Sequence, residues 1–138
     1  MVTVYADLAL MQAQSGEIAA GVVLYHHGPD GPADYCVISA YYDATLPDGK
    51  KRSVKQTLPT LISAIIRYSG PGAQKIALFH RLPHLLYHRQ IMDNVITQGV
   101  IVTFTETPRR KMTYARLLLE DAARRKDTVI QPVGGYNV

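Results

Sequence analysis

Apolar residues along the chain gather in short runs separated by turn-forming residues, a pattern typical of strands and helices packed around one core. The first three runs are rich in β-branched and other apolar residues, which favour strands, and short turns join them. These runs cover Val2–Met11, Ile18–His27 and Asp34–Tyr42. Two short connections in succession predict that the three strands form an antiparallel meander.

A helix is predicted after the polar loop that follows the third strand. Pro59 is tolerated only in a first turn, so the helix should begin near Thr57, or at Ser53 if the proline kinks it. Gly70 is placed to end this helix. Apolar residues repeat with helical spacing and define one face that should be buried, formed by Leu58, Leu61, Ile62 and Ile65.

The next part of the sequence reads as strand, helix, strand. Strands are predicted over Lys75–His80 and Val100–Thr105. Between them, Pro83 opens a second helix and Gly99 ends it. Because a helix joins the two strands, we expect them to lie parallel in one sheet.

A final helix is predicted after the last strand. Thr107 followed by Pro108 has the form of an N-cap with proline at the first helical position. The helix should run to about Lys126, and residues 127–138 should form a loose C-terminal tail. The residues expected to face inward are Met112, Ala115, Leu118, Leu119 and Ala122.

The predicted order is therefore βββαβαβα, in one α/β domain that covers residues 1–126. The simplest arrangement is a mixed five-stranded sheet flanked by helices. Strands one to three form its antiparallel part, the fourth strand lies parallel beside the first, and the fifth beside the fourth. The order of connection reverses between the first and fourth strands, and ligands bind at such switch points, which singles out Asp7 and His80.

The chain is basic, with 15 lysine and arginine residues against 11 aspartate and glutamate residues and a net charge of +4. This balance is compatible with a polyanionic partner but does not require one. The basic residues form two clusters, and either cluster alone is also consistent with an ordinary solvated surface. The clusters are Lys50, Lys51, Arg52 and Lys55, and Arg109, Arg110, Lys111, Arg116, Arg124, Arg125 and Lys126.

Two features bear on where the protein is expected to work. Cys36 is the only cysteine, so no intrachain disulfide can form and the reducing cytoplasm is the expected compartment. The longest apolar runs, such as Ile18–Tyr25, are much shorter than the ~20 residues that a membrane helix needs. No membrane association is therefore expected.

The order of elements and three segments resemble the ribonuclease H-like superfamily. Val4-Tyr5-Ala6-Asp7 resembles the first strand of that fold, which carries the family's leading aspartate. Ala20–Tyr25, followed by Gly28, resembles the second strand, and Ile38–Tyr42 resembles the third. The resemblance covers residues 2–126 and implies a ribonuclease H-like fold.

The resemblance also implies a set of catalytic positions. In active members, four carboxylates hold two Mg²⁺ ions, which clamp the attacking and leaving oxygens of a phosphodiester displacement. Carried over by position, only the first carboxylate is present here, as Asp7. One carboxylate should not neutralise two divalent ions, so the resemblance implies a domain that has lost its catalytic acids. The other three positions fall at Thr57 (or Gln56 in a shifted register), at His80, and at Leu117 or Leu118.

An active site with displaced ligands is an alternative. Glu106 follows the fifth strand, and Glu120 and Asp121 lie within one turn of the lost position on the last helix. If the register shifts, these acids could join Asp7 and His80 in a Mg²⁺- or Mn²⁺-dependent catalytic site.

A zinc site is a further alternative. His80, His84 and His88 are spaced by four residues, and such spacing can bring two imidazoles to one metal ion. Asp7, His80 and His84 could then bind zinc together. The simpler interpretation is that Asp7 hydrogen-bonds to His80 as a buried polar pair while the other two histidines are ordinary helix residues.

Three functions follow as hypotheses. The first is a catalytically degenerate ribonuclease H-like domain, without a cofactor, that binds nucleic acid (an RNA/DNA hybrid or RNA) or a protein partner and does not cleave. The second is an active Mg²⁺- or Mn²⁺-dependent ribonuclease for RNA/DNA hybrids. The third is a structural scaffold that assembles with a partner or as a homodimer. Phosphate contacts would come from Lys50, Lys51, Arg52, Lys55, Arg109, Arg110 and Lys111.

Overall fold

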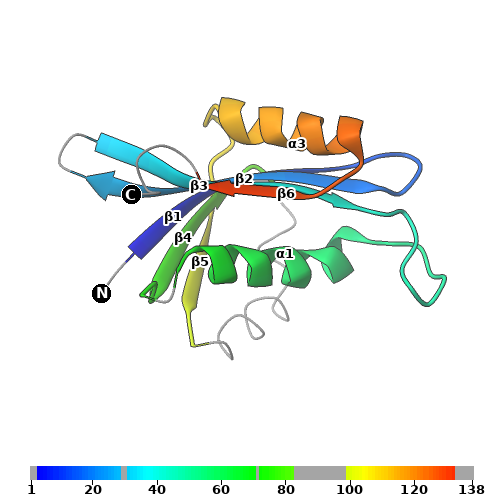
Figure 1. Ribbon diagram of the computed structural model, residues 1–138, viewed down its shortest axis with the longest axis horizontal. Helices are drawn as coiled ribbons and strands as arrows, with labels where there is room; N and C mark the ends of the chain where they lie inside the picture. Colours follow the sequence, from blue (N-terminus) through cyan, green and yellow to red (C-terminus); the bar gives the residue numbers. More distant parts are fainter. Residues whose placement is uncertain (1–2, 29–30, 71, 83–98, 133–138) are drawn as a thin grey trace.

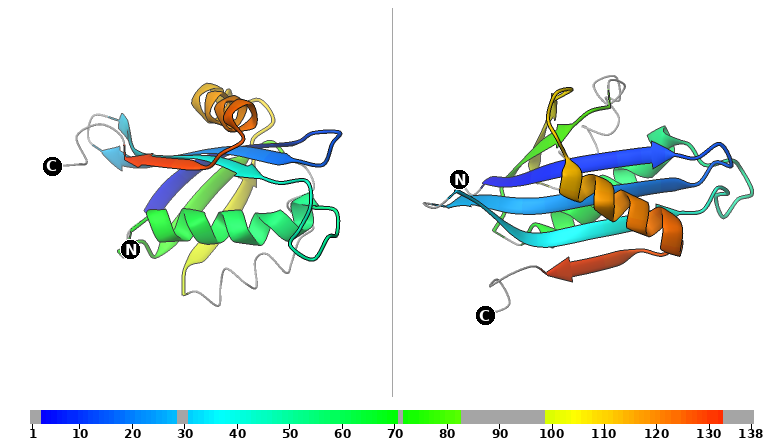
Figure 2. Two further views of the ribbon diagram at one scale, coloured as in Figure 1. Left: turned by 45° about the vertical axis from the view of Figure 1, so that its right-hand side comes forward. Right: turned by 90° about the horizontal axis from the view of Figure 1, so that it is seen from above.

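The computed structural model describes residues 3–28, 31–70, 72–82 and 99–132. Within these ranges it shows one mixed sheet, with α1 covering one face and α3 the other (Figure 1 and Figure 2). None of the helices in these ranges is both long and apolar enough to cross a membrane. The elements are β1 (Thr3–Gln12), β2 (Ile18–Gly28), β3 (Gly31–Tyr42), α1 (Val54–Tyr68), β4 (Lys75–His80), β5 (Ile101–Glu106), α3 (Thr113–Arg125) and β6 (Val129–Pro132).

The strands lie in the order β5-β4-β1-β2-β3-β6. β1, β2 and β3 pair antiparallel, β1 pairs parallel with β4, and β4 pairs parallel with β5. The predicted α/β class is therefore confirmed, as is the mixed sheet with an antiparallel part and a parallel part. The order of connection reverses between β1 and β4, as predicted.

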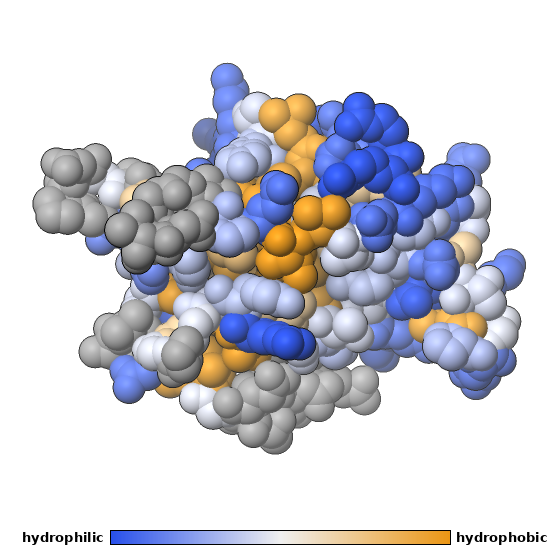
Figure 3. Space-filling view, viewed as in Figure 1, coloured by the Kyte–Doolittle hydropathy of each residue, from blue (hydrophilic) through white to orange (hydrophobic). Residues whose placement is uncertain are grey.

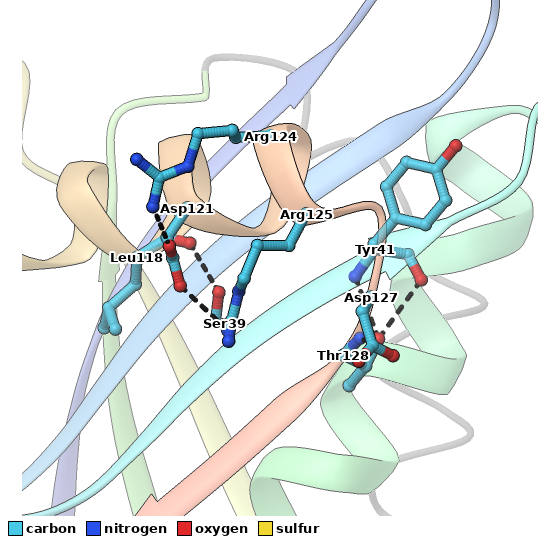
Figure 4. A network of polar contacts seen from close by, with 8 residues as sticks. All are labelled: Ser39, Tyr41, Leu118, Asp121, Arg124, Arg125, Asp127 and Thr128. Atoms are coloured by element: carbon cyan, nitrogen blue, oxygen red, sulfur yellow. Dashed lines mark hydrogen bonds and ion pairs between the residues drawn. The ribbon is translucent and has the colours of Figure 1, made fainter.

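The predicted count of five strands is wrong, because part of the segment expected to be a loose tail forms a sixth strand. β6 pairs antiparallel with β3 over Cys36–Ser39. Just before β6, the Thr128 hydroxyl accepts the Tyr41 N–H at 2.9 Å and donates to the Tyr41 carbonyl at 3.2 Å (Figure 4). Ile130 packs against the core. A strand of four residues is too short for a period-two pattern to stand out in the sequence.

Helix α1 begins at Val54 and not near Thr57. Ser53 is its N-cap: the hydroxyl oxygen accepts the Gln56 N–H at 3.2 Å and the hydroxyl donates to the Gln56 side chain at 3.0 Å. This cap stabilises the first turn and offsets part of the cost of Pro59 inside the helix. The predicted apolar face is confirmed, since all four of its residues are buried: Leu58, Leu61, Ile62 and Ile65.

Helix α3 begins at Thr113, so the predicted N-cap at Thr107 is wrong. The Thr107 N–H and hydroxyl both donate to the His80 carbonyl, at 2.7 and 3.3 Å, so they tie the chain to β4 instead of capping a helix. The Arg110 N–H donates to the Thr107 carbonyl at 3.0 Å and closes a turn. The predicted end is confirmed, because Lys126 forms the C-cap in the left-handed conformation.

Helix α3 lies directly on the backbone of β2. A Cβ atom at Gly21 would come within 1.8 Å of the Ala115 carbonyl oxygen and 2.7 Å of the Leu119 backbone nitrogen. On β3, the Ser39 hydroxyl donates to the Leu118 carbonyl at 2.6 Å (Figure 4). These contacts fix α3 on this face of the sheet, and with it the basic loop that connects β5 to α3.

The face of the sheet under α1 carries the larger apolar core. Alternate residues of β1 and β4 pack with the buried face of α1 in one cluster, as the pleat of a strand requires. On the α3 face the layer of apolar side chains between helix and sheet is thinner, because Gly21 lets the helix come close to the sheet. The residues that β1 and β4 contribute to the α1 core are Val4, Ala6, Leu8, Ile76 and Leu78.

Candidate functional site

Asp7 lies on β1 with its side chain on the α3 face of the sheet. Its alternate neighbours on the strand, Tyr5 and Ala9, pack against the clusters that line this face, and side chains two residues apart share a face. The parallel partner of Asp7 on β4 is Phe79, and its antiparallel partner on β2 is Val23. The switch-point aspartate therefore faces the loop that leads into α3.

Asp7, Tyr25 and Arg110 form a closed polar triad. Arg110 Nη2 lies 3.1 Å from Asp7 Oδ1 and 3.3 Å from Oδ2. The same nitrogen donates to the Tyr25 hydroxyl at 2.9 Å, and that hydroxyl donates to Asp7 Oδ1 at 3.3 Å. The Asp7 side chain is 18% exposed and that of Arg110 is 38% exposed. Each member therefore has a polar partner, and Arg110 is the member most accessible to solvent.

Aromatic rings surround the triad. The Arg110 guanidinium lies over the Phe79 ring, 4.9 Å from its centroid, a cation–π geometry. Tyr5 stacks on Tyr25 with centroids 5.6 Å apart, and the His27 ring meets Tyr5 edge-on at 4.4 Å. These rings restrict the orientation of the guanidinium and of the Tyr25 hydroxyl.

An open pocket of about 480 Å³ lies beside the triad. Asp7, Tyr25 and Arg110 line it, together with His27, Asp34 and Lys111. The pocket is thus lined by aromatic rings and by side chains of both charges. It is large enough for a phosphate group or part of a nucleotide.

Burial sets the proton affinities within the triad. Burial raises the pKa of Asp7 above its ordinary value of 3.8, and the charge and hydrogen bonds of Arg110 act in the opposite direction without reversing the shift. Burial, followed by the charge of Asp7, raises the pKa of Tyr25 to about 12. Tyr25 is therefore a neutral hydrogen-bonding group at physiological pH and not a base.

His80 does not meet Asp7. It follows Phe79, the partner of Asp7 on β4, so it points to the opposite face of the sheet. His80 is fully buried; its Nδ1 accepts the Leu82 N–H at 3.0 Å, and its Nε2 has no hydrogen-bond partner in the described part of the chain. Burial lowers the pKa of His80, against the effect of Glu106.

The structure thus contains neither the expected Asp7–His80 hydrogen bond nor a zinc site that joins those two residues. His84 and His88 lie outside the described residues, as does the segment in which the sequence predicts a second helix starting at Pro83. The reason for the failed pairing is one step of strand register, which reverses the side of the sheet to which a residue points.

The other candidate acids do not gather around Asp7 either. Glu106 pairs in register with His80 and therefore shares its face of the sheet. Glu120 is exposed on α3 and lines a second pocket. Asp121 forms ion pairs with Arg124 at 2.6 Å and with Arg125 at 2.8 Å on its own helix (Figure 4).

The residues present do not fit a pair of Mg²⁺ ions at Asp7. Both of its carboxylate oxygens contact Arg110 Nη2, and the acids proposed as displaced ligands lie elsewhere. Within residues 3–28, 31–70, 72–82 and 99–132, no three His, Cys, Asp or Glu side chains form a group that could hold a metal ion.

The basic residues nearest the triad are exposed. Arg109 and Lys111 flank Arg110 in the loop before α3 and are open to solvent. In the other predicted cluster, Arg52 donates to the Asp43 carbonyl at 2.5 Å and to the Thr57 hydroxyl at 3.2 Å. The remaining members of that cluster, Lys50, Lys51 and Lys55, are exposed. In Figure 3, strongly hydrophilic side chains also gather over the C-terminal half of α3.

Neither a family model nor a curated protein matches this chain. The resemblance to the ribonuclease H-like superfamily therefore stays a prediction from the sequence.

The sequence indicated Asp7 and Arg110 but not that they form one unit. Tyr25 and Phe79 were missed as members of the site. The period-two pattern places Tyr5 and Asp7 on one face of β1, and Tyr25 pairs with Tyr5, so the aromatic lining follows once the strand register is known. Nothing in the local sequence indicates that Arg110 reaches Asp7, because the contact depends on the conformation of an irregular loop.

Proposed function

We propose that this chain is a catalytically degenerate ribonuclease H-like domain that binds nucleic acid, an RNA/DNA hybrid or RNA, without cleaving it. The strand order β5-β4-β1-β2-β3 and the helices on both faces support the fold in this proposal. The strand segments that resemble the superfamily, beginning with Val4-Tyr5-Ala6-Asp7, support it further.

The ion pair between Arg110 and Asp7 carries the proposal. A guanidinium lies 3.1 Å from the one carboxylate that the resemblance retains. A divalent ion at Asp7 would have to displace this charge and would also be repelled by Arg109 and Lys111 beside it. Two-metal hydrolysis needs two such ions. The site is therefore better suited to attract anions than to hold cations.

A second arginine supports the same interpretation. At Thr57, the position that the resemblance gives to the first-helix glutamate, a buried neutral hydroxyl accepts a hydrogen bond from Arg52 at 3.2 Å. Two of the positions assigned to metal-binding acids thus contact guanidinium groups. Arginine is well matched to phosphate geometry, although Arg52 is itself largely engaged by its own loop.

The placement of the exposed basic residues favours a polyanion as the partner. β1 and β3 are both antiparallel to β2, and β1 is parallel to β4 and β5. The loops after β3 and after β5 therefore leave the sheet at the same carboxyl edge. These loops carry Lys50 and Lys51, and Arg109 and Lys111. Basic residues that share one edge can follow a phosphate backbone.

Binding of a labelled RNA/DNA hybrid tests the proposal. We expect binding that weakens steeply between about 50 and about 200 mM salt, and an intact hybrid after incubation with Mg²⁺ or Mn²⁺. Lys111→Gln should weaken binding and reduce the salt dependence by about one phosphate contact. Lys75→Gln is the matched control, because Lys75 starts β4 and so lies at the opposite edge of the sheet.

Each other outcome has a distinct meaning. No binding at low salt contradicts the nucleic-acid proposal; a dimer that forms with rising concentration in size-exclusion chromatography would then favour a scaffold. Metal-dependent cleavage that Asp7→Asn abolishes would favour an active ribonuclease. Equal losses from Lys111→Gln and Lys75→Gln would indicate a general charge effect and no defined site.

A further inference from the structure

The hydrogen-bonding geometry of Arg110 limits how it can bind a phosphate. A guanidinium grips a phosphate most strongly with two parallel N–H groups along one edge. Two of its edges are available for this, one formed by Nε and Nη2 and the other by Nη1 and Nη2, because the side chain itself blocks the third. Both usable edges therefore include Nη2.

In this structure Nη2 of Arg110 is already engaged. It contacts both oxygens of Asp7, at 3.1 and 3.3 Å, and donates to the Tyr25 hydroxyl at 2.9 Å. The nitrogen has two hydrogens, and these partners account for both. A phosphate that approaches Arg110 in this state can take only single hydrogen bonds from the other nitrogens.

We propose that Asp7 is an internal competitor for phosphate at Arg110, so that the Asp7–Arg110 pair keeps nucleic-acid affinity below what the basic loop could provide. This inference rests on the proposed nucleic-acid binding and adds how that binding is limited. The carboxylate inherited at the switch point would then act as a latch on an anion site and not as a metal ligand.

The surroundings of the pair permit the exchange. The Arg110 side chain is 38% exposed and follows a turn outside any helix or strand, so it can reorient toward an incoming phosphate. When Arg110 leaves, the Tyr25 hydroxyl still donates to Asp7, which keeps one hydrogen bond on the carboxylate. A polyanion can therefore displace Asp7 from Arg110.

Replacement of the carboxylate gives the direct test. Asp7→Asn should tighten binding of the labelled RNA/DNA hybrid by about tenfold, because a charge-assisted contact becomes free to form with phosphate. The salt dependence should steepen by about one phosphate contact, a change in slope of about 0.9. In an Arg110→Ala background, Asp7→Asn should have almost no effect on affinity.

Asp34 supplies the matched control. It lines the same pocket as Asp7, and its charge raises the pKa of Asp7, but it is not one of the contacts of Arg110 Nη2. Asp34→Asn thus removes the same charge from the same pocket without releasing Arg110. We expect it to tighten binding by about twofold at most, the effect of reduced repulsion alone.

Tyr25→Phe keeps the test informative if Asp7→Asn does not fold. It removes only the hydroxyl that occupies one hydrogen of Nη2, and its ring retains the stacking on Tyr5. We expect binding to weaken by about threefold, because Asp7 loses the hydrogen bond that it would keep when Arg110 leaves and therefore holds Arg110 more firmly.

The outcomes separate the latch from the proposed function. Binding by Asp7→Asn that is tighter than that of the unmodified protein, and that is lost in the Arg110→Ala background, supports the latch. If the unmodified protein binds and Asp7→Asn is no tighter than Asp34→Asn, the latch is wrong while nucleic-acid binding stands. If no variant binds the hybrid at low salt, both proposals are wrong.

Discussion

Asp7 and His80 lie one register step apart on neighbouring parallel strands, yet their environments differ completely. Asp7 faces α3, is partly exposed, and has Arg110 and Tyr25 as partners. His80 faces the α1 core, is fully buried, and, among the described residues, has a hydrogen bond at only one of its ring nitrogens. The sheet thus separates a charged, partly exposed site on one face from a buried, mostly apolar core on the other.

The two faces also differ in how their helices are held. α1 rests on a thick layer of apolar side chains, whereas α3 touches the β2 backbone at Gly21. The α1 face therefore provides most of the hydrophobic stabilisation. The α3 face positions a loop, and through that loop a charged site, at modest cost in buried apolar area.

The largest loss of stability is expected when a side chain is added at the point where α3 contacts the sheet. Gly21→Ala should destabilise the protein by about 4 kcal/mol, because its Cβ would lie 1.8 Å from the Ala115 carbonyl oxygen and neither backbone can yield easily. Urea unfolding monitored by circular dichroism measures the change. Gly72→Ala is the control, since a Cβ there meets nothing within 4 Å; equal losses in the two variants would contradict the close approach.

A slightly smaller loss is expected from the α1 face. Leu61→Ala should cost about 3 kcal/mol, because it leaves a cavity among fully buried side chains. The same urea titration measures it. Leu117→Ala on α3 provides the comparison, since that side chain is 58% exposed and should change stability little. A large loss at Leu117 would mean that the outer surface of α3 is covered in solution.

The difference between the faces also explains what the sequence could reveal. The spacing of Leu58, Leu61 and Ile65 shows the buried face of α1, because burial on one side of a helix imposes a regular period. Thr107-Pro108 has the form of a helix start, but the Thr107 hydroxyl binds the His80 carbonyl instead. A local pattern cannot reveal that a distant carbonyl competes for the capping side chain.

The candidate site was harder to predict than the fold for a related reason. Asp7 and Arg110 are 103 positions apart in the sequence, and their contact depends on an irregular loop with no period of its own. The pairing expected between Asp7 and His80 failed on a single step of register. Topology brought the correct strands together, but only the pleat decides which side chains share a face.

A loss of stability of intermediate size is expected when the pH is lowered. Burial lowers the pKa of His80 from its ordinary value of 6.5, so the unfolded chain takes up this proton at a higher pH than the folded protein does. The contribution of neutral His80 to stability is complete above pH 6.5 and is lost as the pH falls through the window between 6.5 and the lowered folded-state value.

Urea unfolding at several values from about pH 5 to about pH 7.5 tests this expectation. The unmodified protein should lose stability toward the acid end, by less than Leu61→Ala costs. His80→Leu should flatten the profile, because it removes the proton uptake of His80. Every other histidine is present in both proteins, so a difference between the two profiles comes from His80. Parallel profiles for the two proteins would show that His80 does not titrate in this range.

The smallest effect is expected at the charged site, and its sign is informative. Burial raises the pKa of Asp7 above 3.8 despite Arg110. The contribution of Asp7 to stability is therefore complete below pH 3.8 and is lost as the pH rises through the folded-state value.

The ionised carboxylate therefore gives little stability at neutral pH, and Asp7→Asn should change the free energy of unfolding by no more than about 0.5 kcal/mol. Arg110→Ala should cost about 1 kcal/mol, because it leaves a half-buried carboxylate without its charged partner. Urea titrations at pH 7 compare the two variants. A greater loss from Asp7→Asn than from Arg110→Ala would mean that the carboxylate holds the fold together and does not serve as the latch on Arg110.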